Sequence, residues 1–197
     1  YPFPSNIRTE IKKDLGEFPF PAFWGPAAGT KGQFAPDQVS RWIAESAKWI
    51  ENRYHPTLSL IYLPHLDYNL QRLGPKNHEV LNDFRRIDSI AGDLIAFFEK
   101  NGIEPIILSE YGISAVSQPV HLNRLFRDKG WIAIKDELGL EMLDAGASKV
   151  FAVADHQIAH VYVNDPSILP QVRTALEQTD GVERVLGAEE KRAMGVD

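Results

Sequence analysis

Several kinds of residue are scarce or missing, and each absence narrows the possible functions. The 197-residue chain has no cysteine and only two methionines. The lack of cysteine excludes disulfides, thiolate nucleophiles, iron–sulfur clusters and Cys-type zinc sites, so His, Asp and Glu remain as candidate metal ligands. No apolar run approaches the roughly 20 residues that a membrane-spanning helix needs. The first residues also lack a basic region followed by an apolar stretch, so we expect a soluble chain without a membrane partner.

The charge of the chain is weakly acidic. The formal net charge is −6, from 21 basic and 27 acidic residues. This balance argues against binding to a nucleic acid polymer, which requires a clear excess of positive charge. Hydrophobic residues make up 44% of the chain and charged residues 24%. These proportions are typical of a globular domain and exclude a mostly disordered chain.

Apolar runs and helical patterns alternate in the first half of the chain. Residues 58–63 and 105–109 are short, apolar runs of the kind found in buried strands, and residues 76–101 between them carry apolar side chains at helical spacing. A crossover of this length favours parallel pairing of the two strands. We therefore predict an α/β fold, a mainly parallel sheet with flanking helices, in one domain over residues 1–197.

The other elements follow from shorter patterns. Helices are expected at 6–15, 36–53, 123–129 and 165–178, and further strands at 131–134, 150–154, 158–163 and 181–186.

Polar residues follow both predicted central strands. Asp67 lies in an expected polar turn after the first strand, and Glu110 directly follows the second. In open parallel sheets, ligands bind beyond the carboxyl ends of the strands. The two carboxylates are thus predicted to meet at one sheet edge, where they could hold a divalent cation, although such carboxylates also commonly cap helices and turns.

Three histidines are the remaining candidate metal ligands. His65 lies two residues before Asp67, and His156 and His160 belong to the segment Asp155-His156-Gln157-Ile158-Ala159-His160. Imidazole is a common metal ligand, and it equally serves as a hydrogen-bonded structural group.

Taken together, these segments resemble a known family. Tyr62-Leu63-Pro64-His65-Leu66-Asp67, the following Gly74-Pro75, Asp88, and Ser109-Glu110-Tyr111-Gly112-Ile113 look like the type I phosphodiesterase/nucleotide pyrophosphatase branch of the alkaline phosphatase superfamily. The resemblance covers roughly residues 20–113. It implies an alkaline phosphatase-like fold of which this chain is a part, a divalent metal, expected to be zinc, and a small-molecule phosphate ester as substrate.

The chain departs from the pattern of that family at several positions. Asp67 matches a metal-binding Asp, but Gln71 stands where the family has a metal-binding His, and Glu110-Tyr111 replaces an Asp-His pair. No residue matches the nucleophilic Thr of the family. The resemblance therefore implies a metal-dependent phosphohydrolase in which this chain lacks part of the site. The alternatives are a catalytically lapsed or repurposed binding module on the same fold, and a hydrolase of phosphonate or sulfate esters.

Overall fold

The computed structural model describes residues 5–25, 35 and 37–196. The chain divides into two compact units, Tyr1–Val116 and Ser117–Asp197. The expectation of a single domain over residues 1–197 stays a prediction. Within the described residues, no helix is long and apolar enough to cross a membrane.

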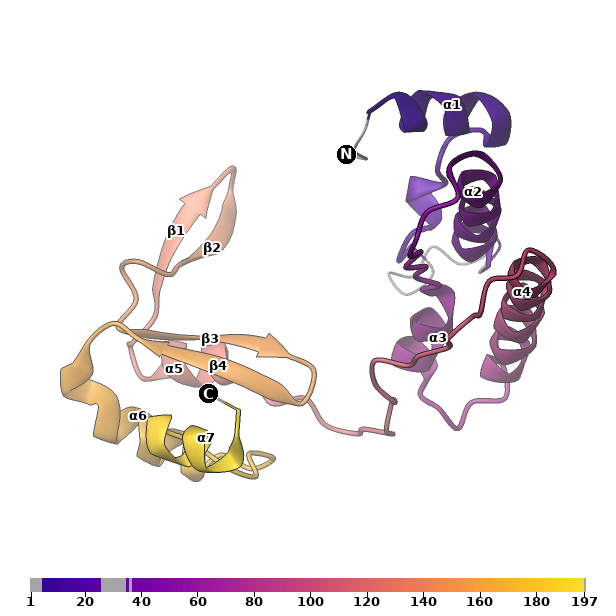
Figure 1. Cartoon of the computed structure of the whole chain (residues 1–197). Coiled ribbons are helices and arrows are strands. Elements are labelled where there is room, and N and C mark those ends of the chain that lie inside the picture. The colour runs from indigo at the N-terminus through magenta and orange to yellow at the C-terminus, as the bar shows by residue number, and fades with distance from the viewer. Residues whose placement is uncertain (1–4, 26–34, 36, 197) are drawn as a thin grey trace. The chain divides into compact units, whose positions relative to one another are not determined.

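The first unit is built from helices (Figure 1). Its three longer helices were expected from the sequence, and the structure confirms them, apart from Pro36, which lies outside the described residues. Ala44 from the second helix packs with Ile90, Leu94 and Phe98 from the fourth to form the core. The elements are α1 (Ser5–Leu15), the 3-10 turn η1 (Phe20–Ala22), α2 (Gln38–Tyr54), α3 (His65–Leu73) and α4 (Val80–Lys100).

The predicted parallel sheet is wrong. The strands of the described residues form two antiparallel two-stranded sheets, both in the second unit. Residues 58–63 and 105–109 have no strand pairing. Leu60 and Leu108 are 89% and 86% exposed, whereas Ile61 packs against the α2–α4 core. An apolar run becomes a strand only when a neighbour satisfies its backbone hydrogen bonds, and hydrophobicity alone does not supply that neighbour.

The segment after Leu63 is the helix α3, and the expected polar turn is wrong as well. The helix begins directly after Pro64 and ends at Gly74, whose φ of 80° is one that glycine readily adopts. Tyr68 and His65, three residues apart on one face, are fully buried. Burial of this face and the contacts between α3 and α4 stabilise a helix of only nine residues, which would be marginal in isolation.

The second unit combines two β-hairpins with short helices (Figure 1). Each hairpin is antiparallel, with Ile134 opposite Leu143 in the first and Ala152 opposite Val161 in the second. The elements are α5 (Leu122–Asp128), β1 (Ala133–Glu137), β2 (Leu140–Asp144), β3 (Val150–Asp155), β4 (Ile158–Val163), the 3-10 turn η2 (Pro166–Ile168), α6 (Leu169–Glu177) and α7 (Ala188–Met194).

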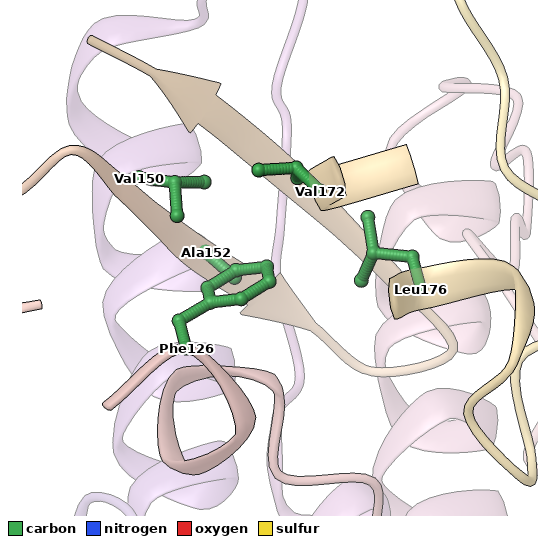
Figure 2. Packing of buried hydrophobic residues seen from close by; sticks show 5 residues of the cluster. All are labelled: Phe126, Val150, Ala152, Val172 and Leu176. Carbon is green, nitrogen blue, oxygen red and sulfur yellow. The ribbon is translucent and has the colours of Figure 1, made fainter. Parts of the chain in front are cut away.

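Figure 2 shows the core of the second unit, where side chains from α5, β3 and α6 converge. All of its members are at most 6% exposed. They are Phe126, Val150, Ala152, Val172 and Leu176.

The sequence patterns located most elements of this unit. The strands at 150–154 and 158–163 and the helix at 123–129 are confirmed within one residue. The helix expected at 165–178 is present as the 3-10 turn η2 followed by α6, and the Asp165 side chain accepts from the Ser167 amide at the N-cap of η2. The predicted strand at 131–134 starts two residues later. The edge strand expected at 181–186 is wrong, because this segment has no strand pairing. Val185 from it instead packs against the hydrophobic core.

One side chain of α5 pairs with the backbone of β3. The Asn123 amide donates to the Ala152 carbonyl at 2.8 Å, and the Ala152 amide donates to the Asn123 Oδ1 at 2.7 Å. Two such bonds to one residue reproduce the contact that a neighbouring strand would make. Asn123 therefore fixes α5 against the hairpin.

Candidate functional site

Asp67 and Tyr111 join two segments that are 44 residues apart in the sequence. Asp67 lies on α3, and Tyr111 lies in the loop after residues 105–109. The Tyr111 hydroxyl donates a hydrogen bond to Asp67 Oδ2. This hydrogen bond, with smaller contributions from burial and the nearby carboxylates, raises the pKa of Tyr111 to about 12. Tyr111 is therefore a protonated donor, and not a phenolate, throughout the physiological pH range.

Glu110 and Tyr62 belong to the same cluster. The pKa of the Tyr62 phenol is raised, first by burial and then by the negative charges of Asp67 and Glu110. Glu110 also raises the pKa of Tyr111. Both carboxylates thus act on the same two phenols, which places the two predicted site residues in one local, electronegative region. We call Tyr62, Asp67, Glu110 and Tyr111 the carboxylate–phenol cluster.

His65 is fully buried, and both nitrogens of its ring make hydrogen bonds that hold the fold together. Its Nδ1 lies 2.9 Å from Ser40 Oγ, and its Nε2 lies 3.4 Å from the Asp83 carbonyl oxygen. Burial lowers the pKa of His65, so the neutral imidazole is favoured. The ring is turned toward α2 and α4.

His156 and His160 lie in the second unit, on the hairpin of β3 and β4. His156 occupies the turn with a φ of 54°, and its Nε2 is 3.7 Å from Asp155 Oδ1. His160 lies on β4 opposite Val153. Both histidines are exposed. Their assignment as metal ligands stays a prediction.

The donors of the carboxylate–phenol cluster fit a metal centre only in part. Two carboxylates and two protonated phenols are present, with no imidazole among them. No group of three or more His, Asp or Glu side chains that could hold a metal occurs among the residues that the structure describes. A structural zinc site has four ligands and a catalytic one has three from the protein. The described residues do not by themselves fit a zinc site.

Sequence reasoning missed the partners that hold this cluster in place. Tyr111 was noted only as a substitution, whereas the structure makes it the partner of Asp67. Asn69 and Asp83 were assigned no role, and the structure joins them by a 2.6 Å hydrogen bond between α3 and α4. Helical spacing in residues 65–73, bounded by Pro64 and Gly74, was the signal that could have revealed α3 and therefore this contact.

Comparison with known proteins extends the resemblance seen in the motifs. The sequence profile described as Type I phosphodiesterase / nucleotide pyrophosphatase matches residues 9–192 and thus reaches into both units. No curated protein and no solved structure shows a significant match. The motif positions around Asp67 and Glu110 lie inside the matched region. This chain belongs to the type I phosphodiesterase/nucleotide pyrophosphatase family.

Proposed function

We propose that this chain acts in the hydrolysis of phosphodiester or pyrophosphate bonds in small molecules, and that Asp67 is the central residue of its site. The family supports this class of reaction. The observation that carries the assignment to Asp67 is the hydrogen bond from Tyr111, because it brings together the two segments that hold the family motifs.

The charges of the cluster bear on how it would receive a phosphate ester. Asp67 and Glu110 make the region electronegative, and a phosphodiester is itself an anion, so direct contact between them is repulsive. A divalent cation between carboxylates and phosphate is the usual solution to this repulsion. Metal dependence, with zinc as the first expectation, is therefore part of the proposal. Because the described ligands are incomplete, we infer that they supply only part of the site.

The phenols of the cluster have a role that needs no cation. Tyr111 holds the Asp67 carboxylate in one orientation. Tyr62 is half-exposed, and its raised pKa keeps its hydroxyl protonated, so it can donate a hydrogen bond to a non-bridging phosphoryl oxygen. A preorganised donor of this kind stabilises charge that develops on the phosphoryl group.

A binding module on the same fold is the second candidate. It is favoured by the same hydrogen bond, because Tyr111 occupies a lone pair of Asp67 that a cation would otherwise use. In this case the chain would bind a phosphate ester and release it unchanged.

Hydrolysis of bis(p-nitrophenyl) phosphate by the full 197-residue chain distinguishes the two candidates. With an incomplete ligand set, we expect a turnover below about 1 s⁻¹, the low end of ordinary enzymes, that rises on addition of Zn²⁺ or Mn²⁺. Asp67→Asn should abolish the cation-stimulated part. Glu99→Gln, which removes an exposed carboxylate from α4, is the matched control and should leave it unchanged.

Three other outcomes contradict the proposal. Hydrolysis that is indifferent to added cations argues against metal dependence, and hydrolysis that survives in Asp67→Asn removes Asp67 from the site. Binding of the diester in a calorimeter without any hydrolysis supports the binding module. Parallel assays with p-nitrophenyl sulfate and a phenylphosphonate ester test the remaining alternative, since a sulfate or phosphonate esterase should prefer one of them.

A further inference from the structure

Asp83 is a buried carboxylate whose location needs an explanation. It lies in the first turn of α4 and is 2% exposed. Among the ion pairs of the described residues, none involves Asp83. Burial of a carboxylate without a cationic partner is costly, and an apolar residue at such a position commonly gives the more stable protein. Its hydrogen bonds therefore point to a role other than stability alone.

The Asp83 carboxylate is bound by a side chain of α3. The Asn69 amide nitrogen donates to Asp83 Oδ2 at 2.6 Å. The Asn69 Oδ1 in turn accepts from Arg72, at 2.8 Å from Nη2 and 3.3 Å from Nε. Arg72 fixes the orientation of the amide and polarises it, which strengthens the bond to the carboxylate. Asp83 is thereby linked to a positive charge through one amide group.

The Asp83 backbone holds α3 at a second point. The Asp83 carbonyl oxygen can only accept, so the bond to His65 Nε2 at 3.4 Å requires the proton to be on Nε2. His65 Nδ1 then accepts from the Ser40 hydroxyl at 2.9 Å. His65 and Asn69 are four residues apart, one turn along the same face of the helix. One residue of α4 thus contacts α3 at both ends of a turn.

Asp67 lies between these two contacts in the sequence of α3, and it is bound by Tyr111. The helix has nine residues and no side-chain hydrogen bond at its N-cap. A helix this short depends on tertiary contacts for its position. A rotation or slip of α3 against α4 would therefore move the Asp67 carboxylate away from the Tyr111 hydroxyl.

We propose that Asp83 is a positioning residue: its carboxylate accepts from Asn69 and, together with the backbone contact to His65, fixes α3 against α4 and thereby sets the place where Asp67 meets Tyr111. The variants below remove or exchange the carboxylate and leave the backbone contact in place. The use of Asp67 in hydrolysis rests on the proposed function. The mechanical coupling between Asp83 and the Asp67–Tyr111 hydrogen bond does not, and it is tested without any substrate.

Raman spectroscopy of tyrosine measures this coupling in the full chain. The Fermi doublet of a tyrosine ring reports whether its hydroxyl donates a strong hydrogen bond, and subtraction of a Tyr111→Phe spectrum isolates the signal of Tyr111. Asp67→Asn defines the change that follows when the carboxylate is lost. We expect Asp83→Ala to shift the doublet in the same direction, although Asp83 itself does not contact Tyr111.

Two further variants separate positioning from general damage. Asp88→Ala removes an exposed carboxylate from the same helix and should leave the doublet unchanged. The exchange Asn69→Asp with Asp83→Asn keeps one carboxylate and one amide between the helices and should restore the doublet to its wild-type form. The exchange also decides the question if Asp83→Ala does not fold.

The proposal is overturned by an unchanged Tyr111 doublet in folded Asp83→Ala, with folding checked by far-ultraviolet circular dichroism. An exchange variant that folds but keeps the altered doublet overturns it too. If the chain does not hydrolyse any phosphodiester, the proposed function is wrong, but the spectra still test whether Asp83 positions α3.

Discussion

Ionisation of Tyr111 is the property of the candidate site that can be measured most directly. Its pKa is raised from an ordinary value of 10.0 to about 12, chiefly because its hydroxyl donates to Asp67. A normal tyrosine is about nine-tenths ionised at pH 11, whereas a group with a pKa of 12 is about one-tenth ionised there. Subtracting the titration of Tyr111→Phe from that of the wild type isolates the tyrosinate absorbance of Tyr111 near 295 nm. This absorbance should rise only as the pH approaches about 12. In Asp67→Asn it should appear at a pH closer to 10.

The same shift determines how the pair contributes to stability. The pKa of Tyr111 is higher in the folded chain than in the unfolded one, so the contribution is complete below pH 10 and is lost as pH rises through about 12. For a fully buried group the shift would correspond to about 2.7 kcal/mol. Tyr111 is 45% exposed, and solvent screening reduces the contribution to roughly 1 kcal/mol. Superimposable wild-type and Asp67→Asn titrations would refute the contact between the two residues.

Three further predictions concern the fold. Val150→Ala leaves a cavity in the core of the second unit and should lower the free energy of unfolding by about 2 to 3 kcal/mol, which corresponds to roughly 30- to 150-fold faster amide exchange in β3 and β4. Val153 lies on the same strand but its side chain is 50% exposed, so Val153→Ala should change the exchange rate less than about 5-fold. Equal effects would contradict the assigned register. Leu60→Ser should change the free energy of unfolding, measured with urea, by no more than about 0.5 kcal/mol. Ile61→Ser should lower it by about 1 to 3 kcal/mol, because Ile61 packs against the core of α2 and α4 and Leu60 is exposed. Burial lowers the pKa of His65 beneath its ordinary 6.5, so the free energy of unfolding should decrease as pH falls below about 6.5. If a His65→Gln chain shows the same decrease, another group causes it.

The sequence located helices better than sheets, for a physical reason. The apolar periodicity of α4 and of α6 reflects a face that each helix buries locally, so spacing alone predicts both. Residues 58–63 carry an equally strong apolar signal, but a strand exists only through its partner. Leu60 remains exposed because no neighbour pairs with its segment among the described residues.

The candidate site was predicted in part. Asp67 and Glu110 were placed together by an argument from parallel strands that the structure contradicts, yet both do act on the same phenols. The resemblance to the family assigned both positions to one site independently of the sheet. The hydrogen bond from Tyr111, by contrast, depends on the path of a loop, which no local pattern in residues 109–113 encodes.

Asn123 has a consequence for how copies of this chain behave in concentrated solution. A strand at the margin of a two-stranded sheet exposes backbone donors and acceptors that invite pairing with another molecule. At Ala152 both of these groups are already bound to the Asn123 amide. A second hairpin approaching this margin finds no hydrogen bond to make there and meets α5 in its path. Asn123 therefore blocks backbone pairing with another molecule at this one position on the margin of β3.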